Sequence, residues 1–252
     1  MRERPLILVT NDDGVRALGL RALVEVLLPY GELAVIAPER AMSGKSSAIT
    51  VETPLRLKET EIAGLPVYQC SGTPVDCVKV GVNHLLKRRP DFVVSGINHG
   101  SNSSVNVLYS GTMGAAVEGA LNGVPSIGFS LCSHAPDADF SCATGWVARI
   151  FRAVASNGMP SGVCLNVNIP EGDISDFEIC RQTTGRWVEE IISRHDPAGK
   201  EYLWLAGEYR NLEPEVAGTD INALDNNRVA IVPIQVDMTA HKMLAQLKNW
   251  DI

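Results

Sequence analysis

Short, unbroken apolar segments constrain the fold of this sequence more than any other feature. Leu6 to Thr10 (LILVT), Leu33 to Pro38 (LAVIAP), Asp91 to Ile97 (DFVVSGI) and Ser126 to Leu131 (SIGFSL) lack the polar alternation of half-exposed strands, and stretches with helical spacing separate them. A strand that is apolar on both faces must be covered on both faces, as in a parallel sheet between layers of helices. The pattern predicts a doubly wound α/β fold, in which ligands bind at the carboxyl ends of the strands.

The same periodicity places the remaining elements. It predicts two further strands, at 67–70 and 163–170, and four helices, at 20–28, 75–87, 112–121 and 143–155. Beyond residue 170, turn signals separate the segments WVEEII, EYLWLAG and RVAIVPIQV, so we expect hairpins outside the main sheet that form an oligomerisation arm. We predict one domain over residues 1–252, with an α/β core (1–170) and a C-terminal hairpin region that ends in a closing helix (171–252).

Composition narrows the setting of the protein. The formal net charge of -7 argues against binding to a nucleic acid polymer, because such proteins need basic patches. The apolar run near the start is too short for a signal peptide, and no segment is suited to span a membrane. The six cysteines are scattered, without a C-x-x-C pair for zinc or redox chemistry. We expect a cytoplasmic protein with free thiols and no membrane partner.

Two adjacent carboxylates, Asp12 and Asp13, directly follow the first predicted strand. They lie where α/β proteins bind ligands, and a divalent cation between them would offset their repulsion. Hard oxygen ligands favour Mg²⁺ or Mn²⁺. A turn followed by a helix cap would explain Asn11, Gly14 and one aspartate, but it does not require two in succession. We therefore favour a metal site.

A second loop, ERAMSGKSS, follows the strand LAVIAP. It lacks the earlier glycine of a P-loop, so the G-x-x-x-x-G-K-[ST] pattern fails. Gly44, Lys45 and Ser46 nevertheless offer a backbone N–H group, an ammonium charge and a hydroxyl to an anion. A solvated connection explains this composition equally well.

A third segment, from Asn98 to Thr112, concentrates amide and hydroxyl groups between a buried strand and a helix. The N–H groups at the helix start, at Ser110, Gly111 and Thr112, favour a phosphate group, although capping alone would explain these residues. The amide oxygen of Asn98 suits a metal ligand, and a turn role is the alternative. His99 has the chemistry of a general acid, but a lone loop histidine is more often a surface or turn residue.

Taken together, NDDG, APERAMSG, SGTPVDCV, VVSGIN and SGTMGAAVEG resemble the motifs of the survival protein SurE family, and LNVNIP, TDINAL and VPIQVDMT fit the same family. The resemblance runs from Leu8 to about Thr239. It implies a Rossmann-like core with a C-terminal hairpin exchanged between subunits. It also implies a metal-dependent 5'-nucleotidase that hydrolyses nucleoside monophosphates, with side activity on 3'-nucleotides, other phosphate monoesters and short polyphosphate.

The resemblance further implies that Asp12, Asp13, Ser43 and Asn98 bind one divalent cation, Mg²⁺ or Mn²⁺, per subunit. Such an ion would bind a phosphoryl oxygen and orient an attacking water, with Asp12 and Asp13 as the catalytic residues. Asp12 is a poor candidate for the general base, because ligation depresses the pKa of a carboxylate. The predicted phosphate-binding residues are Asn11, Gly44, Lys45, Ser46, Ser110, Gly111 and Thr112.

The sequence departs from the family pattern in places that affect loop shape and substrate choice. Lys45 is inserted before the serines of the second loop, HGSNSS lacks the last glycine of a G-x-N-x-G run, and Asn227 and Arg228 replace a glycine-tyrosine pair. A nucleotide-binding sensor and a metal-dependent glycosyltransferase are the alternative functions, since either uses a strand-end acidic site. We expect a nucleoside monophosphate as the bound substrate and a homodimer or homotetramer formed through the hairpin.

Overall fold

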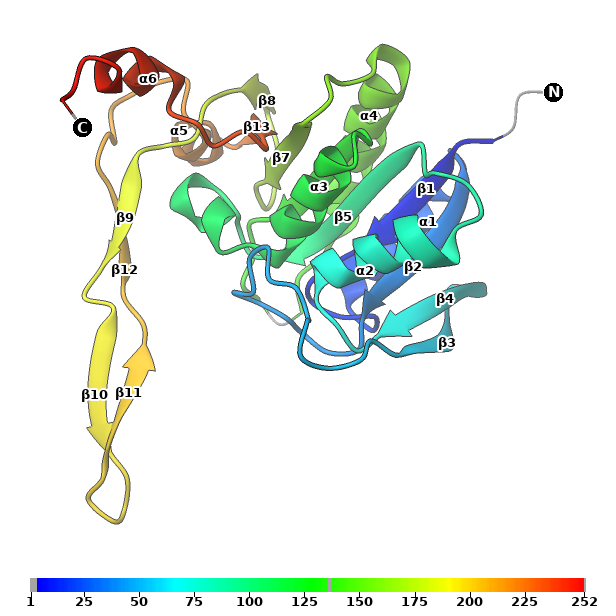
Figure 1. Cartoon of the computed structure of the whole chain (residues 1–252), viewed down its shortest axis with the longest axis horizontal. Helices are drawn as coiled ribbons and strands as arrows, with labels where there is room; N and C mark the ends of the chain where they lie inside the picture. The colour runs from blue at the N-terminus through cyan, green and yellow to red at the C-terminus, as the bar shows by residue number, and fades with distance from the viewer. Residues whose placement is uncertain (1–3, 136, 252) are drawn as a thin grey trace.

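The computed structural model describes residues 4–135 and 137–251 and has a central sheet with helices on both faces (Figure 1). The order of the strands across this sheet is β3-β4-β2-β1-β5-β6-β7-β13-β8. The strands are β1 (Leu6–Thr10), β2 (Glu32–Pro38), β3 (Leu57–Ile62), β4 (Leu65–Cys70), β5 (Phe92–His99), β6 (Ser126–Leu131), β7 (Val163–Ile169), β8 (Asp176–Ile179) and β13 (Arg228–Gln235). From β4 to β7 all neighbours pair in parallel, which confirms the predicted α/β fold.

Four helices cover the two faces of the sheet: α1 (Leu18–Leu27), α2 (Pro74–Val80), α3 (Gly111–Leu121) and α4 (Ser141–Asn157). α1 and α4 pack in one apolar cluster with the central strands, whereas α2 and α3 contribute to clusters on the opposite face (Figure 1). α3 packs closely against the sheet, because its small residues let its backbone approach β6. A Cβ on Gly119 would lie 2.2 Å from Oγ of Ser126. The start of α3 lies next to the loop after β1, since a Cβ on Gly111 would lie 2.8 Å from Cβ of Asp12.

Two elements in the first half differ from the sequence prediction. The predicted helix 75–87 is α2 only up to Val80, and the chain continues as a π-helical turn (Gly81–Leu85) in which the N–H of Leu86 donates to the carbonyl of Gly81. Strand β3 was not predicted, because most of its residues are exposed and polar and it carries no apolar run. It forms an antiparallel hairpin with β4 at the edge of the sheet.

The prediction that RVAIVPIQV lies outside the main sheet was wrong. This segment is β13, which pairs antiparallel with β7 and parallel with β8. Four consecutive residues of β13, Val229 to Val232, are buried, which is the pattern of the other central strands. The core sheet therefore extends beyond residue 170 and includes two strands of the region that we assigned to the hairpins.

The predicted hairpins are present between β8 and β13. The strands β9 (Gly185–Val188) and β12 (Glu208–Asn211) pair antiparallel, as do β10 (Ile191–His195) and β11 (Glu201–Leu205). The two ribbons follow one another and project away from the sheet (Figure 1), so we call residues 185–211 the arm. The end of the arm carries exposed apolar side chains, including Trp204 and Leu205. Two helices follow, α5 (Asp220–Asp225) and the predicted closing helix α6 (His241–Leu247), which buries none of its residues.

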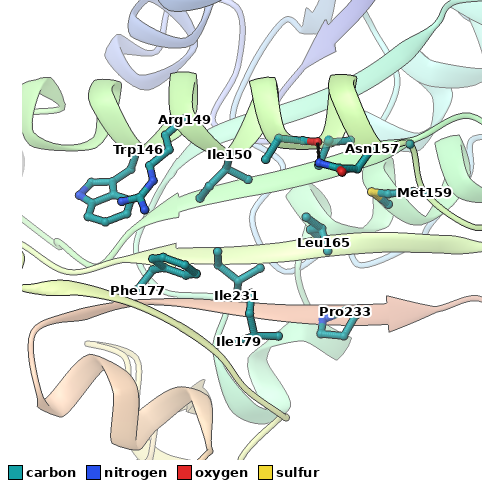
Figure 2. A pocket seen from close by; sticks show the side chains of 13 residues that line it. Trp146, Arg149, Ile150, Asn157, Met159, Leu165, Phe177, Ile179, Ile231 and Pro233 are labelled. Atoms are coloured by element: carbon teal, nitrogen blue, oxygen red, sulfur yellow. Dashed lines mark hydrogen bonds between the residues drawn. The ribbon is translucent and has the colours of Figure 1, made fainter.

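An apolar hollow lies between α4 and the last strands of the sheet (Figure 2). The guanidinium of Arg149 lies 4.9 Å from the ring centroids of both Trp146 and Phe177 at this hollow. None of its lining residues is a predicted site residue. Among the described residues, no helix has the length and apolar character needed to cross a membrane.

Candidate metal and phosphate site

The acidic pair lies in a tight loop at the carboxyl end of β1. The side-chain amide of Asn11 donates to the carbonyl of Gly14 at 3.0 Å, and Gly14 has φ +99, which favours glycine. A Cβ on Gly14 would lie 3.1 Å from the backbone of Arg40. The N–H of Met42 donates to the carbonyl of Asp12 at 2.7 Å. The NDDG loop and the loop after β2 are therefore packed directly against each other.

Asp12 is buried beside the start of α3. Its Oδ1 accepts a hydrogen bond from the hydroxyl of Thr112. Burial raises the pKa of Asp12, and the hydroxyl of Thr112 and the N–H groups of Thr112 and Gly111 only partly offset that effect. The positive end of α3, which we predicted to face a phosphate group, thus also stabilises a carboxylate of the protein.

Asp13 is partly exposed, and nearby donors only partly offset the cost of ionising it. Burial and the neighbouring charge of Asp12 raise the pKa of Asp13 to about 6, although the backbone N–H of His99 donates to its Oδ2 at 3.0 Å. The imidazole of His99 makes no contact of this kind, since its Nε2 is buried without a hydrogen-bond partner in the described structure. His99 therefore hydrogen-bonds to Asp13 through its backbone N–H, and its ring acts on the pKa of Asp13 only through its charge, which lowers that pKa.

Asn98 reaches the same edge of the sheet from β5. A bulge between Ser95 and Asn98 interrupts the pairing of β5 with β6, and Gly96 (φ +129) is required there because a Cβ would lie 2.3 Å from the carbonyl oxygen of Phe129. The Nδ2 of Asn98 donates to the carbonyl of Gly100 at 2.7 Å. Within the described residues its Oδ1 accepts no hydrogen bond, so this oxygen is free for a ligand.

The second loop lies over the start of α3. The N–H of Ser46 donates to the carbonyl of Tyr109 at 3.0 Å, and its hydroxyl donates to the carbonyl of Leu108 at 2.6 Å. Gly114 allows this approach, because a Cβ there would lie 2.4 Å from the carbonyl oxygen of Ser46. Ser43 is exposed at the other end of the loop, next to the Met42 contact with Asp12.

The predicted phosphate-binding residues fall into two groups. The side chains of Asn11, Ser46 and Thr112 already donate hydrogen bonds within the protein. The Oγ of Ser110 accepts from the N–H of Met113 at 3.0 Å, which leaves its own hydrogen free. Lys45 is exposed and forms no ion pair with any described residue.

Sequence reasoning missed the buried polar residues that hydrogen-bond the segment after β5 to β6 and β7. The N–H of Asn102 donates to Oδ1 of Asn168 at 2.8 Å, and its side-chain amide donates to Oγ of Ser130 at 2.9 Å. The Nδ2 of Asn166 donates to the carbonyl of Asn102 at 2.9 Å. Two asparagines on the same face of the apolar strand LNVNI were the available signal, because a buried amide requires partners.

The donor chemistry of the site fits a hard cation. The described residues contain no cluster of three or more His, Cys, Asp or Glu side chains, so an ion at Asp12 and Asp13 must be completed by neutral oxygens. The free Oδ1 of Asn98 and the hydroxyl of Ser43 are such donors, and an all-oxygen set suits Mg²⁺ or Mn²⁺. Around this set, the start of α3 and the second loop offer groups for an anion.

The fold and the site define an α/β protein with a carboxylate pair and an unpaired amide oxygen at the carboxyl ends of β1 and β5. A family model for survival protein SurE matches residues 7–189. The 5'-nucleotidase SurE of Phocaeicola vulgatus is 50% identical over 253 residues, which cover 100% of this chain and 98% of that protein. The chain therefore belongs to the survival protein SurE family.

Other relatives agree with this assignment. The 5'-nucleotidase SurE of Cytophaga hutchinsonii is 49% identical over 98% of this chain and 97% of its own length. The crystal structure of the SurE protein from Aquifex aeolicus matches with a TM-score of 0.84 and 34% identity, and the match covers 97% of this chain and 98% of that one. The similarity thus includes the arm and the C-terminal strands as well as the core.

Proposed function

We propose that this chain is a metal-dependent 5'-nucleotidase, a phosphoric monoester hydrolase that releases phosphate from nucleoside 5'-monophosphates. The observation that carries the proposal is the acidic pair, because the pKa values of Asp12 and Asp13 are both raised at the ligand-binding edge of a parallel sheet. A divalent cation bound between the two carboxylates would offset the cost of ionising them. The name 5'-nucleotidase borne by a relative of 50% identity supports the choice of substrate.

We infer that one divalent cation per subunit, Mg²⁺ or Mn²⁺, binds to Asp12, Asp13, Ser43 and Asn98. When bound, such an ion supplies positive charge that polarises a phosphoryl group and orients the attacking water. The protein contributes the placement of the four oxygens on three loops. The contact of Met42 with Asp12 and the contact of His99 with Asp13 keep these loops together.

The phosphoryl oxygens are bound by groups that the protein leaves free. In this proposal the hydroxyl of Ser110 and the ammonium of Lys45 donate to them, and Gly44 and Gly111 contribute N–H groups. The remaining predicted phosphate-binding residues shape the loops through their internal hydrogen bonds: Asn11, Ser46 and Thr112.

Asp12 and Asp13 act in this proposal by binding rather than as strong bases. Oδ1 of Asp12 already accepts the hydroxyl of Thr112, and a carboxylate next to a cation has a low affinity for protons. The exposed loop with Ser43 and Lys45 leaves the site open on one side, which is compatible with side activity on 3'-nucleotides and short polyphosphate.

A turnover panel tests the proposal. Phosphate release from AMP and from p-nitrophenyl phosphate should require added Mg²⁺ or Mn²⁺ and stop with EDTA. The variant Asp12→Asn should lose activity, whereas Asp91→Asn, a surface carboxylate that pairs with Arg88, should retain it. Transfer of a sugar from a nucleotide sugar without phosphate release would identify a glycosyltransferase instead, and tight AMP binding without turnover would identify a sensor.

We also propose the assembly and location of the protein. The exposed apolar side chains on the arm, such as Trp204 and Leu205, support a homodimer or homotetramer formed through the hairpins, within one domain per subunit. The six free cysteines support a reducing compartment, the cytoplasm. Sedimentation of Leu205→Glu, compared with the unchanged protein, should show a smaller assembly.

A further inference from the structure

A short 3-10 helix, η2 (Ser104–Leu108), joins the two halves of the candidate site. Before it, the chain comes from Asn98, and after it the chain enters α3 through Ser110. The second loop also contacts η2, since the hydroxyl of Ser46 donates to the carbonyl of Leu108. The position of η2 therefore determines how the three loops of the site lie relative to one another.

The base of the arm, β9 and β12, is hydrogen-bonded to η2. The hydroxyl of Tyr209 donates to Oγ of Ser104 at 2.7 Å, and the indole Nε1 of Trp187 donates to Oδ1 of Asn106 at 2.9 Å. The two rings stack edge to face, with centroids 6.2 Å apart. Figure 1 shows β9 and β12 as the only part of the arm that lies next to the core, while β10 and β11 extend beyond it.

A buried carboxylate also hydrogen-bonds to the first residue of η2. Asp220, at the start of α5, is fully buried and accepts the N–H of Ser104 on Oδ2 at 2.7 Å. Its Oδ1 accepts both the N–H and the hydroxyl of Thr183, at 2.9 and 2.6 Å. Ser104 completes the connection by donating its hydroxyl to the carbonyl of Thr183 at 2.8 Å. One carboxylate thus joins α5, the chain that leads into the arm, and η2.

We propose that Trp187, Tyr209 and Asp220 are positioning residues of the phosphatase site. Among the described residues, their side chains hydrogen-bond neither to the acidic pair nor to the predicted phosphate-binding residues, and they act by fixing η2 between Asn98 and Ser110. A displacement of about 1 Å in a catalytic constellation can cost on the order of 10²-fold in rate, so two hydrogen bonds to η2 are sufficient to affect turnover. This inference rests on the proposed function.

The test compares two pairs of identical substitutions. The double variant Trp187→Phe/Tyr209→Phe removes both hydrogen bonds from η2 and keeps the aromatic rings. The matched control Trp250→Phe/Tyr30→Phe makes the same changes outside the arm and η2, where Trp250 is exposed, Tyr30 is half-buried and neither side chain hydrogen-bonds to a described residue. AMP hydrolysis is measured at saturating Mn²⁺, and hydrogen exchange is measured for the peptide that covers residues 98–110.

We expect the first double variant to lose about tenfold in kcat, with KM changed less than about threefold and Tm within a few degrees. Its amides in η2 should exchange faster with or without Mn²⁺, whereas the control should match the unchanged protein in all readouts. Unchanged kcat together with unchanged exchange in η2 overturns the inference, as does an equal loss in both variants. The unchanged protein tests the proposed function separately. If it fails to hydrolyse AMP, the proposed function is wrong, but the exchange comparison still tests whether the aromatic residues fix η2.

Asp220→Asn and Asp220→Glu provide an independent variant set. In Asp220→Asn, the amide can place its N–H donor against the N–H of Ser104. We therefore expect faster hydrogen exchange at Ser104 and a lower kcat in the soluble enzyme. Asp220→Glu keeps a carboxylate and should restore part of both. If Asp220→Asn does not fold, the comparison rests on Asp220→Glu and on the aromatic variants. Equal kcat and equal exchange in Asp220→Glu, Asp220→Asn and the unchanged protein contradict the role of this residue.

Discussion

The hydroxyl of Thr112, the second residue of α3, donates a hydrogen bond to Oδ1 of Asp12 and thereby joins the start of α3 to the acidic pair after β1. Both residues are buried. The bond fixes Oδ1 of the carboxylate, and in the proposed site Oδ2 would bind the cation. The start of α3, which the sequence predicts as a phosphate site, therefore also orients a carboxylate of the protein itself, that of Asp12.

Thr112→Val should separate orientation from charge at Asp12. Valine has the shape of threonine but no donor, so Oδ1 loses its side-chain partner in a buried position. Hydrogen bonds to charged groups contribute about 1.5–3 kcal/mol, and we expect unfolding in urea to show a loss of that order. Mn²⁺ affinity should fall about tenfold. Thr112→Ser keeps the hydroxyl and serves as the control, and equal affinities in the two variants would contradict this role.

Asp13→Asn should make the metal-free protein more stable while it removes metal binding. Burial and the charge of Asp12 raise the pKa of Asp13 to about 6, so the ionised carboxylate destabilises the fold at pH 7.5. An amide keeps the acceptor for the N–H of His99 and removes the charge. We expect the free energy of unfolding without metal to rise by about 1–2 kcal/mol. Calorimetry without Mn²⁺ measures that gain, and a lower Tm than in the unchanged protein would refute it.

The stability of the metal-free protein should also fall as the pH rises through the same window. Folded Asp13 releases its proton near pH 6, whereas the unfolded carboxyl does so near 3.8, so the folded state binds more protons between these values. The free energy of unfolding therefore decreases from about pH 4 to about pH 6. With Mn²⁺ present, the free energy of unfolding should instead increase with pH. Mn²⁺ binding requires the ionised carboxylates and weakens as the pH falls below about 6. Urea unfolding of the metal-free protein at several pH values tests the first statement, and metal-free Asp13→Asn should lack the part of the transition that Asp13 contributes. Titration of Mn²⁺ into the unchanged protein at the same pH values tests the second.

The sequence predicted the parts of the molecule that depend on local patterns. Apolar runs such as LILVT gave the central strands, and their parallel arrangement placed Asp12, Asp13 and Asn98 at one edge of the sheet. β13 was misassigned although it has the same apolar pattern, because its position after the hairpins carried more weight than its composition. Pairing between β13 and β7 depends on residues far apart in the sequence, which no local pattern records.

The support of the site could not be predicted, for the same physical reason. Ser104 and Asp220 are 116 residues apart, and Trp187 and Asn106 are 81 residues apart. Each of these side chains also has a plausible local role as a cap, a turn residue or part of a hairpin. Their contacts follow from where β8, the arm and α5 lie after folding, so only the tertiary structure reveals that they meet at η2.

Gly111→Ala provides a steric test of the contact between α3 and the acidic pair. A Cβ on Gly111 would lie 2.8 Å from Cβ and 3.0 Å from Oδ2 of Asp12, so the carboxylate must move to accommodate it. We expect a loss of at least tenfold in Mn²⁺ affinity and in AMP turnover. The stability should change little, since the higher helix propensity of alanine, worth up to about 1 kcal/mol, opposes the clash.

The matched control is Gly145→Ala, which lies in the exposed part of α4. A Cβ at this position meets no atom within 4 Å, so the substitution adds helix propensity without a contact. It should stabilise the protein by about 0.5–1 kcal/mol and leave Mn²⁺ affinity and turnover unchanged. Full Mn²⁺ affinity in Gly111→Ala would mean that Asp12 tolerates the displacement, and the geometry at the start of α3 would then not be what fixes the metal ligand.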